Sequence, residues 1–142
     1  MLLEAFNVCL RQLKVGVKLS EVHAAVRTEF TNRKKEHLLQ YLSATLGAGI
    51  GLNVNERLLT INAENDTVIN AGSCFCVRMQ LSGLPPTKGC AHVHTMQLAD
   101  TVFVGASGES QVLTGETTKS YNDVSYTLEE EEEKHESSPA KG

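Results

Sequence analysis

The spacing of apolar residues changes at Gly47, and this change limits the fold more than any other feature of the sequence. Before Gly47, apolar side chains recur about every three or four residues, a period typical of helices. After Gly47, short apolar runs alternate with Gly, Asn and Pro, a pattern typical of strands joined by turns. Helices followed by strands within 142 residues predict a single α+β domain.

Two helices are expected before Gly47. The first should end near Gly16, which can adopt the backbone conformation of a C-terminal cap. The second should begin at Ser20, an N-cap residue type, and end at the basic stretch 33–35. That stretch fits a solvated helix end better than a nucleic-acid contact, because cations are favoured at helix C-termini. The apolar faces comprise Leu2, Leu3, Phe6, Leu10 and Leu13 in the first helix and Val22, Ala25, Val26 and Phe30 in the second.

Short strands are expected in the rest of the chain. They cover residues 73–81, about 90–98, 101–104, 111–114 and 123–128. A polar turn is expected at residues 62–66, and the Gly-Leu-Pro-Pro stretch at 83–86 should end the first of these strands. Gly47, Gly49 and Gly51 have no Cβ, which would allow another part of the chain to approach the backbone closely.

The net charge of −4 is concentrated at the end of the chain. Residues 129–142 hold six Glu and two Lys, which leaves 11 acidic and 11 basic residues in 1–128. A neutral body offers no surface for phosphates, so direct DNA binding is disfavoured. Residues 129–142 also lack apolar side chains to bury, and we expect them to form a disordered acidic tail after a domain at 1–128.

The sequence gives no sign of a membrane partner. No apolar run approaches the roughly 18 residues that span a bilayer. Residues 1–4 lack the basic region and cleavage site of a signal peptide. We therefore expect a soluble intracellular protein. Nothing points to secretion, so the cysteines are expected to be free thiols; these are Cys9, Cys74, Cys76 and Cys90.

Two short Cys and His motifs raise the alternative of a zinc site. They are Cys74-x-Cys76 and Cys90-x-His92-x-His94. In the simpler interpretation, these residues occupy alternate positions of two neighbouring strands. If residues 83–89 close an antiparallel hairpin, position 78 faces about position 94, and Cys74 lies roughly 20 Å from His92. That distance favours two ordinary strands over a zinc site.

Four motifs occur in an order that is similar to the creatinase and methionine-aminopeptidase family. They are Gly-Ala-Gly-Ile-Gly-Leu-Asn-Val-Asn-Glu at 47–56, Asn-Ala-Gly-Ser-Cys-Phe at 70–75, Leu-Ala-Asp-Thr-Val-Phe-Val at 98–104 and Val-Leu-Thr at 112–114. The resemblance covers residues 1–128. It implies the C-terminal half of a pita-bread fold, with two helices followed by a curved, mainly antiparallel sheet.

The resemblance also implies that the metal site of that family is lost. Family enzymes hold two metal ions with five ligands, two of which come from the first half of the domain. The matching positions here give a vestigial pocket of Ala48, Asn55, Glu56, Arg78 and Ala99, in which only Glu56 is acidic. Alanine has no donor atom, and an arginine places a permanent positive charge where a cation would bind. We therefore expect no metal, no other cofactor and no peptidase activity.

An inactive domain of this kind resembles the large-subunit family of FACT, the nuclear histone chaperone. The shared stretches are Gly-Ile-Gly-Leu at 49–52, Leu-Ala-Asp-Thr-Val at 98–102, Leu-Thr at 113–114 and the Glu run at 129–133. The sequence departs from that family at Asn53, Asn55 and 72–75. The resemblance implies histones and the HMG-box subunit as partners, the nucleus and chromosome as location, and a role in nucleosome disassembly and reassembly during transcription, replication and repair.

The acidic run has two interpretations. Clustered carboxylates complement basic histones, which makes Glu129, Glu130, Glu131, Glu132 and Glu133 a candidate histone contact. A solvated linker to a following domain is the simpler interpretation of so short a run. Two alternatives stand for the chain as a whole: a metal-dependent aminopeptidase-like enzyme, or a truncated product without function.

Overall fold

The computed structural model describes residues 1–53, 55–115 and 119. The strand expected at 123–128, the boundary after residue 128 and the acidic run lie outside the described residues. The elements in chain order are α1 (Leu2–Gln12), α2 (Leu19–Asn32), the 3-10 helix η1 (Glu36–Tyr41), β1 (Gly47–Ile50), the 3-10 helix η2 (Arg57–Leu59), β2 (Cys74–Leu84), β3 (His94–Val104) and β4 (Ser110–Val112).

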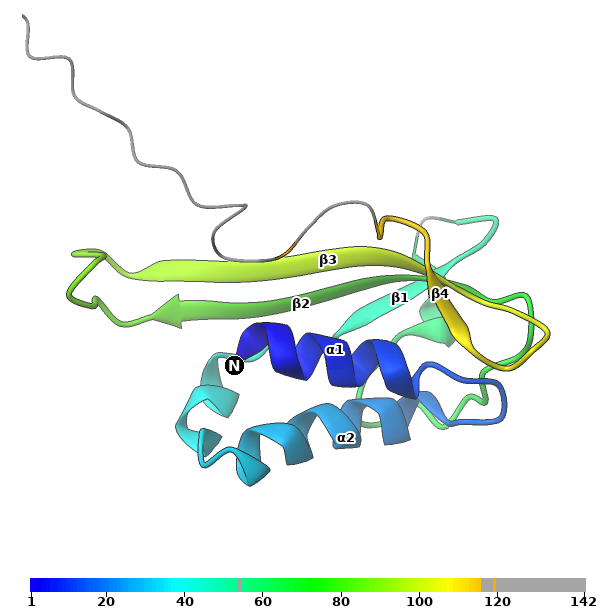
Figure 1. The fold of residues 1–142 in the computed structure, drawn as a ribbon, viewed down its shortest axis with the longest axis horizontal. Helices are drawn as coiled ribbons and strands as arrows, with labels where there is room; N and C mark the ends of the chain where they lie inside the picture. Colours follow the sequence, from blue (N-terminus) through cyan, green and yellow to red (C-terminus); the bar gives the residue numbers. More distant parts are fainter. Residues whose placement is uncertain (54, 116–118, 120–142) are drawn as a thin grey trace, which may run out of the picture.

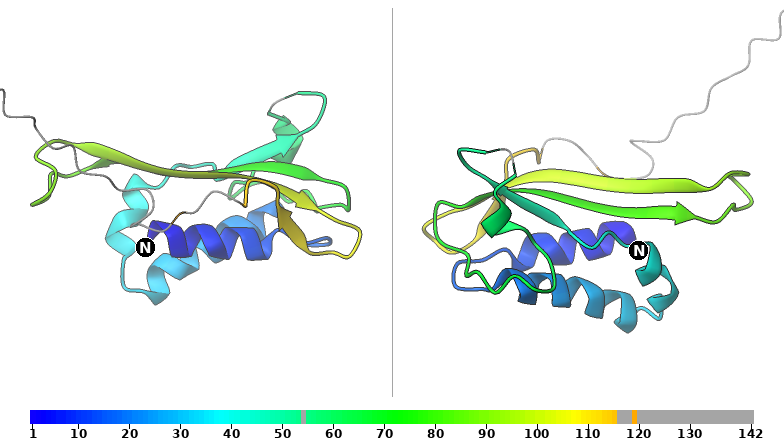
Figure 2. Two further views of the ribbon diagram at one scale, coloured as in Figure 1. Left: turned by 45° about the horizontal axis from the view of Figure 1, so that its top comes forward. Right: turned by 180° about the vertical axis from the view of Figure 1, so that it is seen from behind.

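The described strands form one antiparallel sheet in the order β1-β2-β3-β4. Helices α1 and α2 run side by side on one face of this sheet, as Figures 1 and 2 show from three directions. No helix of the described residues covers the opposite face. The α+β class expected from the sequence is confirmed.

The core lies between the helices and the sheet. Along β2, Phe75, Val77 and Met79 are fully buried, and they alternate with residues that are more exposed. Phe6 of α1 and Phe30 of α2 are fully buried in the same cluster. Because successive side chains of a strand point to opposite faces, this alternation directs every second residue of β2 away from the helices.

Both predicted helix caps are wrong. Helix α1 ends at Gln12, and Gly16 lies in the following loop with a φ of +87°. The Gly16 N–H donates to the Ile69 carbonyl at 2.9 Å, so this loop pairs with a distant segment and does not continue the helix. Helix α2 begins at Leu19 after Lys18, and the Ser20 hydroxyl donates to Asp66 Oδ1 at 2.5 Å.

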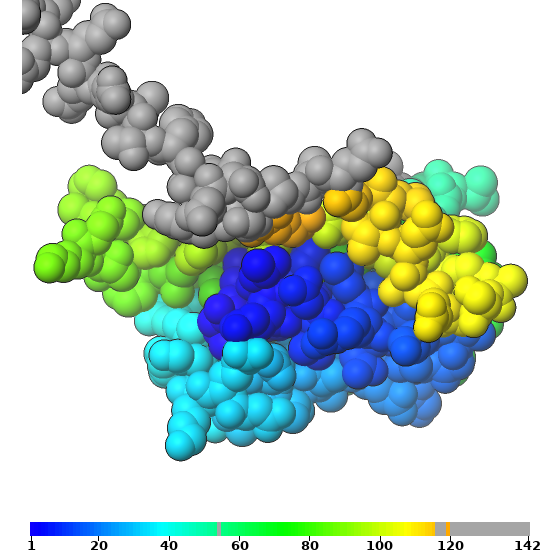
Figure 3. All heavy atoms as spheres, viewed as in Figure 1, coloured from blue at the N-terminus to red at the C-terminus, as the bar shows by residue number. Residues whose placement is uncertain are grey.

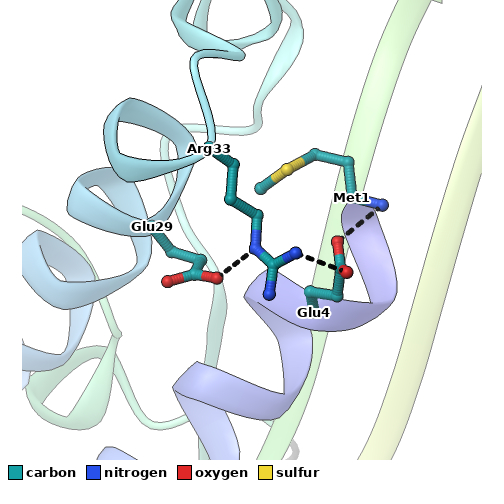
Figure 4. Close-up of polar contacts among 4 residues, drawn as sticks. All are labelled: Met1, Glu4, Glu29 and Arg33. Atoms are coloured by element: carbon teal, nitrogen blue, oxygen red, sulfur yellow. Dashed lines mark hydrogen bonds and ion pairs between the residues drawn. The ribbon is translucent and has the colours of Figure 1, made fainter.

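The expected end of α2 is confirmed, because the helix stops at Asn32, just before the basic stretch. Arg33 does more than face solvent. Its guanidinium forms ion pairs with Glu29 of α2 and, at 2.6 Å, with Glu4 of α1, while the Met1 amine lies 3.1 Å from Glu4 (Figure 4). Arg33 and Glu4 are accessible to water, which screens their charges, so these pairs orient the two helices more than they stabilise them.

Strand β3 differs from the prediction. Two strands were expected, at 90–98 and 101–104, whereas His94–Val104 is one continuous strand. Asp100 breaks the apolar pattern in the sequence, yet its side chain is buried. Its Oδ1 accepts hydrogen bonds from the Thr114 hydroxyl at 2.7 Å and from Lys119 Nζ at 2.8 Å. These partners allow a carboxylate on the core side of the strand.

The predicted hairpin register is also wrong. The loop covers residues 85–93, because β2 continues to Leu84 through an irregularity at which Gly83 has a φ of +72°. Arg78 therefore pairs with Ala99, and Leu84 pairs with His94.

This register separates the two parts of the zinc motif. Cys74 pairs with Phe103, about 30 Å along the strand from His94. In residues 1–53, 55–115 and 119, no group of three or more His, Cys, Asp or Glu side chains could hold a metal ion. All four cysteines are free, as expected, and burial raises the pKa of the Cys9 thiol to about 12.

Close packing at two other points completes the described fold. A Cβ on Gly47, where φ is +143°, would lie 2.3 Å from the Cys76 carbonyl oxygen, so the close approach expected there is confirmed. In the space-filling view (Figure 3), residues 105–115, in yellow, border α1, in dark blue. The Ser110 hydroxyl donates to the Leu10 carbonyl at 2.8 Å at this border. Among the described helices, none has the length and hydropathy to cross a membrane.

Candidate functional site

A pocket of about 370 Å³ opens beside β1 and β2. Cys76, Arg78 and Gln80 of β2 line it, because the residues that alternate with them are buried against the helices. The lining residues are Ser43, Thr45, Gly47, Ala48, Asn55, Thr60, Cys76, Arg78 and Gln80. The pocket therefore belongs to the face of the sheet that α1 and α2 leave uncovered.

Backbone hydrogen bonds hold the segments that form the pocket. The Arg78 N–H donates to the Leu46 carbonyl at 2.8 Å, and the Ser43 N–H donates to the Gln80 carbonyl at 3.0 Å. Ala48 pairs with Cys76 across β1 and β2. The Ile61 N–H donates to the Gly47 carbonyl at 2.9 Å, which brings Thr60 to the opposite side of β1.

Three of the five residues expected at a vestigial pocket line this one: Ala48, Asn55 and Arg78. Ala99 is adjacent to it as the cross-strand partner of Arg78. Glu56 does not line the pocket. Its carboxylate accepts the Asn53 N–H at 3.1 Å, and its own N–H donates to the Gly49 carbonyl at 3.0 Å. Glu56 thus closes the loop after β1.

The motifs did not point to the other polar residues that line the pocket. Ser43, Thr45 and Thr60 lie outside every motif that was identified. Gln80 could have been found, because it is two residues from Arg78 on the same strand and so shares its face. No comparable signal points to Ser43 or Thr45, because their position depends on pairing with β2.

The side chains present do not fit a two-metal centre of the kind that the family enzymes hold. Ala48 and Ala99 have no donor atom, and Arg78 is the only charged residue among those described as lining the pocket. A guanidinium is always protonated, so it would repel a dication at this position. The pocket instead presents hydrogen-bond donors around one positive charge.

The family described as Metallopeptidase family M24 matches residues 1–106. FACT complex subunit SPT16 of Zea mays is 32% identical over 132 residues, which are 92% of this chain and 12% of that protein. The Oryza sativa subsp. japonica subunit is 32% identical over 134 residues, 93% of this chain and 12% of that protein. The chain thus spans about an eighth of the length of these relatives.

Solved structures agree with the sequence comparison. The N-terminal domain of FACT complex subunit SPT16 from Cicer arietinum has a TM-score of 0.81 and 29% identity, covering 89% of this chain and 30% of that one. Prolidase from Pyrococcus furiosus, at 21% identity, covers 84% of this chain and 31% of that one with a TM-score of 0.66, and it supports the fold alone. The chain therefore belongs to metallopeptidase family M24, and it is similar in sequence and in fold to the N-terminal domain of FACT complex subunit SPT16.

Proposed function

We propose that the chain is a non-catalytic histone- and chromatin-binding module of a FACT-type histone chaperone. The observation that carries this proposal is the similarity to SPT16 subunits over 92% of the chain. The pocket is compatible with it, because Ala48 and Arg78, at two positions where the family resemblance leads us to expect metal ligands, offer no group that binds a cation. The chain spans only 12% of the maize subunit, so the role of that whole protein is part of the proposal.

The proposed partners follow from the same similarity. They are histones and the HMG-box subunit of the complex, at chromosomes in the nucleus. The proposed role is nucleosome disassembly and reassembly during transcription, replication and repair. The charge distribution is compatible with histones, because residues 129–142 carry six Glu and only two Lys.

We expect the acidic run to contribute to histone binding through charge. Replacing Glu129–Glu133 with five Gln should weaken binding of purified core histones, and five Asp should not. The difference should shrink as salt rises past about 0.15 M, where the Debye length is about 8 Å. Fluorescence anisotropy with labelled histones would measure this. Equal affinities of the Gln and Asp variants at low salt would make the run a linker.

We also expect no peptidase activity. Peptides with an N-terminal Met or a Pro in the second position should stay intact with the purified chain, with cobalt or manganese present or absent. The reason is the donor set, in which only Glu56 remains acidic and its carboxylate accepts the Asn53 N–H. Metal-dependent cleavage that disappears in Glu56→Ala would show instead that the chain is an aminopeptidase-like enzyme.

A further inference from the structure

We propose that the Arg78 pocket binds a carboxylate group carried by a peptide. The family metal site and the histone contact proposed above both concern cations, whereas this pocket has the opposite chemistry. The inference rests on the lining residues alone. It does not depend on histone binding or on membership of a FACT complex.

Several donors in the pocket have no partner. In the part of the chain that the structure describes, the Arg78 guanidinium, the Asn55 amide and the Thr45 hydroxyl make no side-chain hydrogen bond or ion pair. Arg78 offers five N–H groups, Asn55 two, and Thr45 one O–H. By contrast, the Ser43 hydroxyl donates to the Thr45 carbonyl at 2.7 Å, and the Thr60 hydroxyl donates to the Arg57 carbonyl at 3.0 Å. The unpartnered donors are therefore available to a ligand that accepts hydrogen bonds.

The charge of the pocket favours an anion. No Asp or Glu is among the described residues that line it, so Arg78 has no internal counterion there. Other exposed arginines can pair locally, as Arg33 does with Glu4 and Glu29. A guanidinium fork matches the two oxygens of a carboxylate in a planar, bidentate geometry. One positive charge with neutral donors balances a carboxylate better than a phosphate group, which carries about −1.5 to −2.

The shape of the pocket leaves room beside Arg78. Ala48 and Ala99 flank it with methyl groups only, Ala99 as its direct partner across the β2–β3 ladder. The Arg78 backbone is fixed on its other side by the hydrogen bond to Leu46 at 2.8 Å. A volume of about 370 Å³ is at the lower end of the range for small-ligand sites, which suits one side chain or the end of a peptide.

Nuclear magnetic resonance on the ¹⁵N-labelled chain of 142 residues can test this inference. The probes are acetyl-Ala-Glu-Ala amide and its neutral counterpart acetyl-Ala-Gln-Ala amide. The Glu peptide should shift the Arg78 Nε–Hε and Asn55 side-chain amide signals in a saturable way, and the Gln peptide should not. Acetyl-Ala-Gln-Ala with a free C-terminus separates a terminal carboxylate from one on a side chain.

Variants of the pocket should weaken binding of the Glu peptide by different amounts. Arg78→Gln should weaken the Glu peptide about tenfold or more, because a hydrogen-bonded charge pair is lost. Arg78→Lys should weaken binding of the Glu peptide less, because lysine keeps the positive charge but lacks the bidentate guanidinium geometry. Arg11→Gln is the matched control. Arg11 is an exposed arginine in the last turn of α1, so its replacement removes the same charge outside the pocket. If Arg78→Gln does not fold, Asn55→Ala should still give a smaller loss.

Three results would overturn the inference. They are equal binding of the Glu and Gln peptides, equal weakening by Arg11→Gln and Arg78→Gln, and stronger shifts with inorganic phosphate than with the Glu peptide.

A chain lacking residues 129–142 identifies the source of the carboxylate. Tighter peptide binding in that chain would indicate that its own glutamates compete for the pocket, and unchanged binding would indicate a carboxylate from a partner.

Discussion

At the scale of single residues, His23 is the buried titratable group of α2, with about 5% of its surface exposed. Loss of hydration lowers the pKa of its imidazole, and the nearby charge of Arg27 lowers it further. Val22 and Val26, its neighbours in the helix, belong to the core. The neutral ring therefore behaves as part of that core, and protonation works against folding.

Stability should consequently fall as the solution becomes acidic. The folded pKa of His23 lies below its ordinary value of 6.5, so the unfolded chain binds more protons around that pH. The free energy of unfolding should be fully retained above pH 6.5 and decrease as pH falls through 6.5 toward the folded pKa. Urea titrations at pH 7.5 and 5.5 would measure it.

Two variants separate His23 from the other histidines. His23→Gln should remove most of this pH dependence, while His37→Gln should keep it because His37 is exposed. Asp66 and Glu4 also have lowered pKa values, through the Ser20 hydroxyl and the N-terminal amine respectively, but they act near pH 4. An identical pH dependence in wild type and His23→Gln would contradict the assignment.

The sequence identified part of the pocket at this scale. Ala48, Asn55 and Arg78 came from aligned motifs, and all three line it. Glu56 came from the same motif but faces the loop, because a motif gives the position of a residue along the chain and not the hydrogen bond that its side chain makes. Ser43 and Thr45 depend on a pairing with β2 that no local pattern encodes.

At the scale of elements, β3 is stabilised by an ion pair that the sequence could not reveal. Asp100 and Lys119 are 19 residues apart, and their side chains are 3% and 19% exposed. Lys119 Nζ also lies 6.0 Å from the centre of the Phe6 ring, within the range of a cation–π contact. This contact joins the strand, the first helix and the chain after β4. It also explains why a polar Asp-Thr pair does not interrupt the strand.

Replacing one partner of this ion pair should lower the free energy of unfolding more than replacing both. Asp100→Asn should lower the free energy of unfolding by about 3 kcal/mol, because the mostly buried ammonium of Lys119 loses its counterion. Lys119→Met should also destabilise, whereas Asp100→Leu combined with Lys119→Met should recover most of the loss. A double-mutant cycle by urea denaturation would give the coupling, and additive effects would contradict it.

Element types were more predictable than their ends. Helical period and strand alternation placed α1, α2, β2 and β4 correctly, because burial against one core produces both patterns. The caps at Gly16 and Ser20 failed because long-range bonds to Ile69 and Asp66 determine that connection. The hairpin register failed because Gly83 allows β2 to continue to Leu84.

At the scale of the whole molecule, the sheet is open on one face and at one edge. The outer edge of β1 is already paired, since the Gly47 and Gly49 carbonyls accept the backbone N–H groups of Ile61 and Glu56. Among the described residues, the outer edge of β4 has no such cover, but the strand is only three residues long. Pairing of strand edges should therefore contribute little to self-association. Exposed apolar side chains should contribute more.

We expect the isolated chain to self-associate, or to be marginally stable without a partner. It covers 30% of the chickpea domain to which it is similar. Leu52 and Leu58 follow β1 and are 102% and 79% exposed, which is unusual for large apolar residues close to one another in sequence.

If they drive association, Leu52→Ser with Leu58→Ser should reduce the mass measured by light scattering. Val93→Ser should leave it unchanged, because Val93 is equally apolar and 67% exposed but lies at the far end of the β2–β3 hairpin. A clean wild-type monomer with a sharp, cooperative thermal melt would show that residues 1–128 form an independent domain.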